Sequence, residues 1–148
     1  MLRSVLVLIS VFAALEAGAA TFVVNSVTDQ SDAVPGNGVC SVMAGICTLR
    51  AAIQEANAFA GADVIQIPAG TFTLSIAGAG EENAATGDLD IRDDLTLEGA
   101  SAGTTIVDGG ALDRVLHVQP MNVATLSVTV RDVTLRNGAV TNIYGAGI

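Results

Sequence analysis

The sequence has no lysine and no tryptophan, and only one histidine and one tyrosine among its 148 residues. All six basic residues are arginines scattered along the chain, and the formal net charge is −9. Proteins that bind nucleic acids need clustered lysines or arginines to displace the counterions of the phosphates. Anionic membrane surfaces attract the same basic clusters. The composition therefore excludes nucleic acid as a partner and argues against binding to an acidic membrane surface.

Aromatic side chains make up 3% of the sequence. Sites for sugars and other small ligands are usually lined by such side chains, so we expect no strong carbohydrate site, and any polysaccharide or surface ligand is left unspecified. No serine stands in a nucleophile-elbow motif. His117 lies alone in a strand-like run without a carboxylate motif or nucleophile, and we interpret it as a hydrogen-bonded or surface residue.

Residues 1–20 have the organisation of a cleavable export signal. Arg3 supplies a positive charge, residues 5–15 are apolar except for Ser10, and small residues lead up to Ala20. The apolar run has roughly half of the ~20 residues that a membrane-spanning helix needs. We therefore expect cleavage after Ala20, no transmembrane domain in the mature protein, and a secreted or cell-surface location. An uncleaved membrane anchor is the alternative.

Cys40 and Cys47 are the only two cysteines. In an exported protein such a close pair predicts a disulfide. A metal site is the alternative, but it would need further ligands, and His117 is far away in the sequence.

One segment, at about residues 49–60, has the three- and four-residue apolar spacing of a helix. Thr48 precedes it as a plausible N-cap and Gly61 follows it as a terminator. Its polar residues, such as Arg50 and Glu55, are expected on other faces than the apolar ones. We expect the buried face to consist of four residues: Leu49, Ile53, Ala56 and Phe59.

From residue 63 onward, short runs rich in Val, Ile, Leu and Thr alternate with Gly-, Asp- and Asn-containing turns. Residues 94–99 and 132–138 look like copies of each other 38 residues apart (132 − 94), about two turns of a solenoid with a ~20-residue repeat. A β-sandwich is the alternative, but the repeat and the scarcity of hairpin signals favour a parallel β-helix of about four rungs. The helix would then cover the first rung, whose unpaired backbone groups would otherwise recruit other chains.

These patterns divide the chain into a signal (1–20), an N-terminal cap with a disulfide loop and capping helix (21–62), and the first rungs of a parallel β-helix (63–148). The strand pattern reaches Ile148 without a capping segment. We therefore expect an incomplete solenoid: a fragment, a truncated gene product, or part of an assembly that covers this end.

Residues 47–53 (CTLRAAI), followed by QEAN, resemble the signature of the CSLREA-motif domain, which opens many bacterial β-helix proteins of the pectin-lyase-like superfamily. The similarity extends to TFVVNS at 21–26, PGNGVC at 35–40 and GDLDI at 87–91. Thr48 and Ala51 replace the serine and glutamate of the signature. The resemblance implies an all-β, right-handed parallel β-helix and export, but no particular activity.

Asp88, Asp90 and Asp93 are the candidate metal ligands. Asp88 and Asp90 alternate along a strand and so share a face, and enzymes of that superfamily use such carboxylates to hold calcium or to hydrolyse sugars. We read the group mainly as solvated turn and edge residues, with calcium as the one candidate ion and no other cofactor. Neither Arg92 nor Arg114 sits in the motif of a lyase base.

The leading hypothesis is a non-enzymatic exported β-helix module, the capped base of a bacterial adhesin-like surface protein or extracellular protein. The alternative is a pectin-lyase-like carbohydrate-active enzyme, a polysaccharide lyase or glycoside hydrolase. Its active site would lie near Asp88–Asp94 or outside this sequence.

A bond between Cys40 and Cys47 would stabilise the fold by ~2.5 kcal/mol, because it closes a short loop in the unfolded chain. Urea unfolding with and without a reducing agent measures this difference. The double variant with serine at both positions should match the reduced protein and ignore the reductant. An equal response of both proteins to reductant would contradict the prediction.

Overall fold

The computed structural model describes residues 18–119 and 125–139. The signal expected at 1–20 lies almost entirely outside these residues, as does the end of the expected last rung, 140–148. Within the described ranges, no helix is long and apolar enough to cross a membrane.

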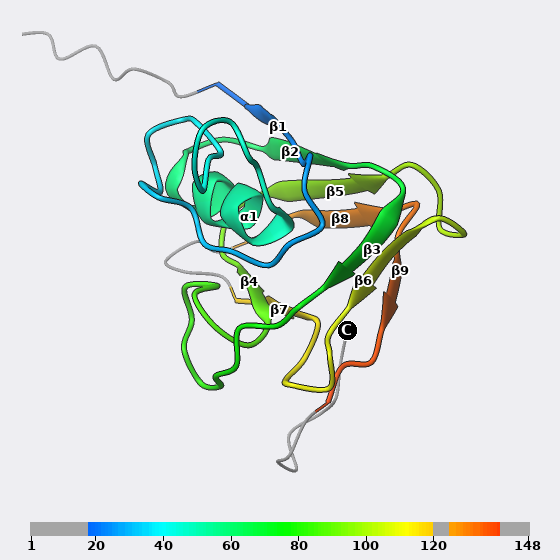
Figure 1. Cartoon of the computed structure of the whole chain (residues 1–148). Coiled ribbons are helices and arrows are strands. Elements are labelled where there is room, and N and C mark those ends of the chain that lie inside the picture. The colour runs from blue at the N-terminus through cyan, green and yellow to red at the C-terminus, as the bar shows by residue number, and fades with distance from the viewer. Residues whose placement is uncertain (1–17, 120–124, 140–148) are drawn as a thin grey trace, which may run out of the picture.

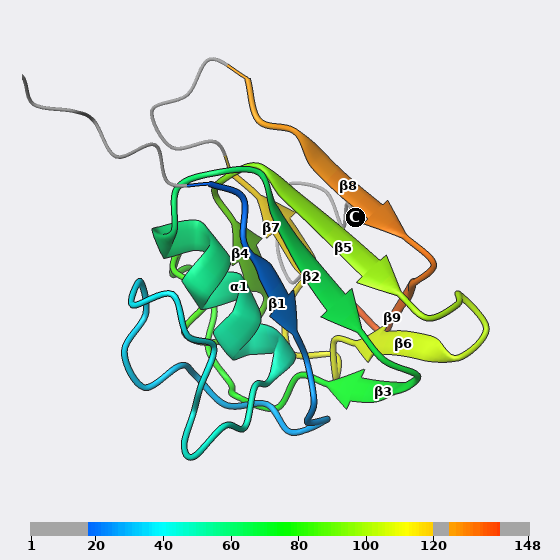
Figure 2. The same ribbon diagram turned by 90° about the horizontal axis from the view of Figure 1, so that it is seen from above.

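Among the described residues, the regular secondary structure is mostly strand, arranged in three separate parallel sheets, with one short helix. The first sheet has the order β1-β2-β5-β8, the second β3-β6-β9 and the third β4-β7, and every pair of neighbouring strands is parallel. The sheets surround a common interior, with β1 and α1 at one end of the stack and β8 at the other (Figures 1 and 2). The elements have these bounds: β1 Thr21–Val23, α1 Leu49–Ala58, β2 Asp63–Ile67, β3 Gly70–Thr73, β4 Leu89–Ile91, β5 Leu95–Gly99, β6 Thr105–Asp108, β7 Leu116–Val118, β8 Val128–Arg131 and β9 Thr134–Arg136.

The repeat expected from the sequence is wrong in its length and in its partners. The two similar segments form β5 and β9, which belong to different sheets. Asp63 instead lies opposite Leu95, and Leu95 opposite Val128, so partners in the first sheet are 32 (95 − 63) and 33 (128 − 95) residues apart. The spacing exceeds ~20 residues because long turns, such as the one between β3 and β4, separate the short strands.

The core lies between the sheets and under the helix. Strand alternation sends Ile65 and Ile67 of β2 inward, and the neighbouring β5 contributes Leu95 and Leu97 on the same face, with Leu97 opposite Ile65. Burying each such side chain contributes about 1.5–3 kcal/mol. The other buried apolar residues of the core cluster come from all three sheets and from α1: Phe22, Val24, Cys47, Leu49, Ala52, Ile53, Ala56, Phe72, Leu74, Ala84, Leu89, Ile91, Val107, Val115 and Leu116.

The helix begins as predicted, since the Thr48 hydroxyl accepts a hydrogen bond from the Ala51 N–H. It ends at Ala58, earlier than expected, so that Phe59 is the C-cap and only partly buried. The other three residues of the predicted apolar face are buried: Leu49, Ile53 and Ala56.

The polar residues Arg50, Gln54 and Glu55 of α1 are also buried, which helical spacing alone did not predict. The loop between β1 and α1 covers them. Glu55 is fully buried, and its Oε2 accepts hydrogen bonds from the N–H groups of Gly36 and Gly38. Both glycines have positive φ angles, of 88° and 80°, which a side chain would strain. The PGNG turn at 35–38 thus supplies the N–H donors for the buried carboxylate of Glu55.

Arg50 is the largest fully buried side chain and joins three parts of the chain. Its Nε and Nη2 donate to the two carboxylate oxygens of Asp29 at 2.6 and 3.1 Å. Its remaining hydrogen bonds reach the backbone oxygens of Ala84, Gly87 and Asp88, just before β4. These five bonds use the five N–H donors of a guanidinium group.

Asn57 occupies the free edge of β4. On one side of β4, the Leu89 N–H donates to Val115 and the Ile91 oxygen accepts from Gln119, both in or next to β7. The backbone oxygen of Asp90 and the backbone N–H of Arg92 therefore face the other side of the strand. The Asn57 side-chain amide donates to the Asp90 backbone oxygen (2.7 Å) and accepts from the Arg92 N–H (2.8 Å).

The Cys40–Cys47 disulfide is present, with a Cα–Cα distance of 5.2 Å, and the described chain has no free cysteine. Cys47 directly precedes the N-cap of α1. The Asn25 side chain donates to the Gly45 oxygen and accepts from the Cys47 N–H, tying this loop to the end of β1. The disulfide therefore closes the loop that leads into the helix, and Asn25 ties that loop to the chain after β1.

Replacing Arg50 with methionine should lower the free energy of unfolding by about 3–5 kcal/mol, because it leaves Asp29 as a buried charge without its partner. Arg131, which pairs with Glu98 on the surface, offers the matched control. Arg131→Met should cost no more than about 1 kcal/mol. Urea denaturation measures both, and equal losses would contradict the central role of Arg50.

Candidate metal centre

The outer face of β4 and β7 carries a group of polar side chains. Leu89 and Ile91 point into the core, so alternation sends Asp88 and Asp90 to the opposite face. Both aspartates are nevertheless buried, with exposed fractions of 1% and 0%. The parallel register places His117 of β7 directly beside Asp90.

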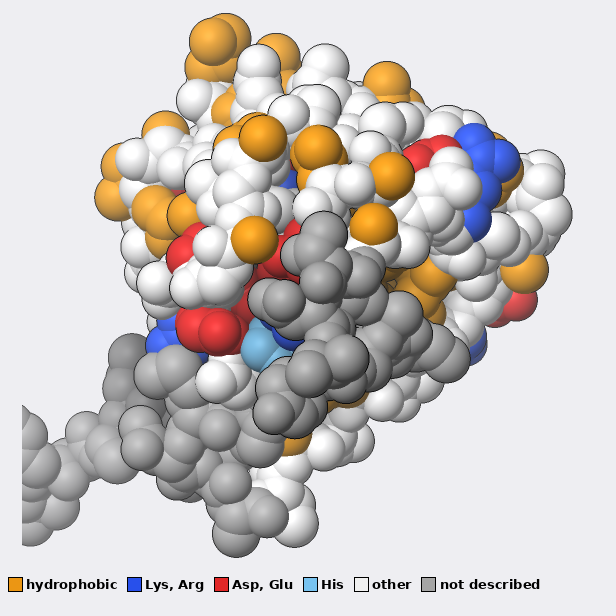
Figure 3. All heavy atoms as spheres, turned by 90° about the horizontal axis from the view of Figure 1, so that it is seen from below, with side chains coloured by type: hydrophobic (Ala, Val, Ile, Leu, Met, Phe, Trp, Pro, Cys, Tyr) orange, Lys and Arg blue, Asp and Glu red, His pale blue; other side chains and the backbone are white. Residues whose placement is uncertain are grey.

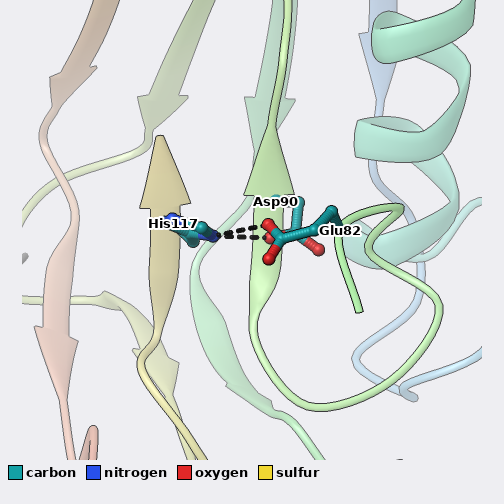
Figure 4. A group of neighbouring side chains, drawn as sticks. All are labelled: Glu82, Asp90 and His117. Atoms are coloured by element: carbon teal, nitrogen blue, oxygen red, sulfur yellow. Dashed lines mark hydrogen bonds and ion pairs between the residues drawn. The ribbon is translucent and has the colours of Figure 1, made fainter. Parts of the chain in front are cut away.

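Three side chains converge at this point: Glu82, Asp90 and His117 (Figure 4). The Nδ1 atom of His117 lies 3.0 Å from Asp90 Oδ1 and 3.1 Å from Glu82 Oε2. One ligand-type atom from each residue lies within 4.8 Å of the other two. In the surface view, the histidine side chain lies next to acidic side chains (Figure 3), and the side chains of His117 and Glu82 are partly exposed although Asp90 is buried.

Arg114 borders this group from the side of Asp88. Its Nε donates to Asp88 Oδ2 at 2.6 Å, and its Nη2 lies 3.3 Å from His117 Nδ1. The Asp88 carboxylate is therefore already paired with a cation, while the Asp90 carboxylate has only neutral partners besides the histidine, chiefly the Ala84 N–H at 2.8 Å.

The loop before β4 holds Glu82 in place. The Glu81 carboxylate accepts hydrogen bonds from the N–H groups of Asn83, Ala85 and Thr86, which closes the loop on itself. The Arg92 side chain donates to the backbone oxygen of Glu82 at 3.1 Å and to the side-chain oxygen of Asn83. Glu82 is thus presented by an ordered loop.

Ala84 anchors the same loop to the rest of the fold. It is fully buried and has a positive φ of 53°, a conformation that costs an alanine of order 1 kcal/mol. Its N–H binds Asp90, and its oxygen accepts from Arg50 and Gln54 of the helix. The contacts from both sides outweigh the strain.

Burial raises the pKa of Asp90, and the nearby Asp88 and Glu81 carboxylates raise it further, against the hydrogen bonds from Ala84 and His117 that lower it. The charged form of Asp90 is therefore costly in the folded state. An additional positive charge at this place would offset that cost.

One imidazole nitrogen and two carboxylate oxygens are a ligand set suited to divalent metals such as zinc. We therefore treat Glu82, Asp90 and His117 as a candidate metal centre.

Only one of the three predicted metal ligands belongs to this group. Asp90 is part of it, Asp88 is occupied by Arg114, and Asp93 binds the N–H of Asp94 and lies near Asp63 instead. Glu82 and His117 were missed. His117 is a hydrogen-bonded residue, as interpreted from the sequence, but its carboxylate partners come from another strand and a loop, so no local motif shows them.

Comparisons with protein-family models, with curated proteins and with solved structures found no match for this chain.

The contribution of Asp90 to the unfolding free energy should fall as the pH rises. Its pKa is raised in the folded state above the ordinary 3.8, so the wild type loses stability relative to Asp90→Asn as the pH rises from 3.8 through the folded pKa. Chemical denaturation of both proteins in metal-free buffer at several pH values measures this difference.

Asp29→Asn provides the opposite sign as a control. Burial alone would raise the pKa of Asp29, but Arg50 and the N–H groups of Ser75 and Ile76 hold it below the usual value. Its stabilisation is therefore present above pH 3.8 and is lost as the pH falls through the folded pKa. Differences between each variant and the wild type that do not change with pH would contradict both assignments.

Proposed function

We propose that this chain is the capped base of a right-handed parallel β-helix in an exported bacterial surface or extracellular protein, and that it has no enzymatic activity of its own. The observation that carries the proposal is the order in which the chain visits the three sheets. From β2 to β9 it passes from the first sheet to the second and third and then repeats the cycle. Such a cycle, with parallel pairing throughout, is how one chain coils into a solenoid.

The contacts of the helix support its role as a cap. The first strand of a stacked sheet presents unpaired N–H and C=O groups, which invite association with other chains. Asn57 binds the two groups on the free edge of β4 that a neighbouring parallel strand would bind. Export is supported by the disulfide, since such bonds persist in oxidising compartments, and by the residues that resemble the CSLREA-motif domain.

The state of the acidic residues supports a structural role. A hydrolase or lyase of a β-helix needs carboxylates or a base free to act on the substrate. Asp88 is paired with Arg114, and Asp90 is buried beneath the loop before β4. Neither is available to a bound polysaccharide in this arrangement.

Asn57→Leu tests the cap. It removes the two bonds to β4 and leaves buried backbone groups unsatisfied, so the free energy of unfolding should fall by about 1–3 kcal/mol. The exposed edge should also promote association. Ala58→Leu adds the same side chain at an exposed neighbouring position and should remain monomeric at the same concentration. Light scattering and urea denaturation distinguish the two, and equal behaviour would contradict the capping role.

The enzymatic alternative is tested by incubating the purified protein with acidic and neutral polysaccharides, with and without calcium. The proposal expects no release of sugars or unsaturated products. Calcium-dependent release that Asp88→Ala or Asp90→Ala abolishes would overturn it in favour of a pectin-lyase-like enzyme.

A further inference from the structure

The hydrogen bonds around His117 do not balance. A neutral imidazole has one N–H, and the nitrogen that faces the group carries at most one proton. Two carboxylate oxygens, from Asp90 and Glu82, lie within about 3 Å of that single nitrogen. Only one of them can accept its proton.

Glu82 is the residue left without a donor. Its Oε2 atom is shielded from solvent and accepts no hydrogen bond, although it lies 3.1 Å from Nδ1. A solvent-shielded carboxylate oxygen without a partner is costly. The loop nevertheless holds it there, through the bonds of Glu81 and Arg92 described above.

The charges do not balance either. Four carboxylates lie around this point, those of Asp88, Asp90, Glu81 and Glu82, against two cations, Arg114 beside Asp88 and Arg92 beside the loop of Glu82. A divalent cation between Nδ1 and the two oxygens would satisfy Glu82 and neutralise the excess. The ligand atoms already lie within 4.8 Å of one another, so binding requires only small movements of side chains.

We propose that Glu82, Asp90 and His117 form a binding site for a divalent transition-metal ion of the zinc class. The imidazole selects such ions over calcium, which prefers oxygen ligands only. Three protein ligands leave a coordination position for water. The ion would join β4, β7 and the loop before β4, so that binding strengthens the contact between neighbouring strands. This inference does not depend on the proposed structural function.

The test uses the full chain without an affinity tag, stripped of metal and titrated with zinc. His117 is the only histidine and the described chain has no free cysteine, so any imidazole response has one source. Zinc should shift the ¹⁵N resonance of Nδ1 in the NMR spectrum and raise the melting temperature. An unchanged imidazole resonance at saturating zinc would overturn the proposal, and so would tighter binding of calcium than of zinc.

Variants locate the ion. Glu82→Gln changes a partly exposed side chain on a loop and should weaken zinc binding, measured by calorimetry, by at least about tenfold. Asp93→Asn removes a nearby carboxylate outside the group and should leave the affinity unchanged. Circular dichroism verifies that both variants fold. An equal affinity of wild type and Glu82→Gln would contradict the site.

The Arg114 guanidinium supplies a second, opposite test, because a positive charge 3.3 Å from Nδ1 opposes a bound cation. The variant Arg114→Gln removes this charge, leaves the negative charge of Asp88 in place, and keeps an amide that can donate to the Asp88 carboxylate. It should bind zinc more tightly than the wild type. An unchanged or weaker affinity would place the ion elsewhere.

Discussion

The buried ion pair between Arg50 and Asp29 is the interaction on which the rest of the structure depends. Arg50 comes from the helix and Asp29 from the loop before it, and the same guanidinium holds the backbone that leads into β4. Asp29 in turn accepts the N–H groups of Ser75 and Ile76 after β3. Removing one partner of a buried ion pair leaves an uncompensated charge at a cost of about 3–5 kcal/mol, so the stability of the fold requires all these segments to be in place together.

This constraint explains why the cap and the candidate metal centre are parts of one arrangement. The bonds from Arg50 and Gln54 to Ala84 fix the loop before β4 against the helix. The same loop then covers Asp90 and brings Glu82 to His117. Local strain at Ala84 and the raised pKa of Asp90 are both accommodated because the helix side of the loop is held so firmly. The polar interior of the cap thus prepares the site on the outer face of the third sheet.

Local features of the sequence predicted what local physics determines. The Thr48 N-cap, the apolar spacing of the helix and the cysteine pair need only neighbouring residues, and all three were predicted. Burial of Arg50 and Glu55 could not be read from helical spacing, because a long, irregular loop covers them. The pairing of Asp90 with His117 depends on the register of strands 27 residues apart (116 − 89), and the apparent 38-residue repeat pointed to the wrong partners. The lengths of the turns set the register between distant strands, and the periodicity of the sequence does not predict those lengths.

The side-chain amide of Asn57 ends the β4 ladder as a peptide group would, and this gives strand addition in that sheet a direction. Chains leaving a ribosome present their N-terminal part first. A closed starting edge then acts as a template, and each later strand pairs with one already laid down. Every such step closes a loop of moderate length and avoids the entropy cost of a distant encounter. Because Asn57 closes one edge of β4, further strands can join this sheet only on the side of β7.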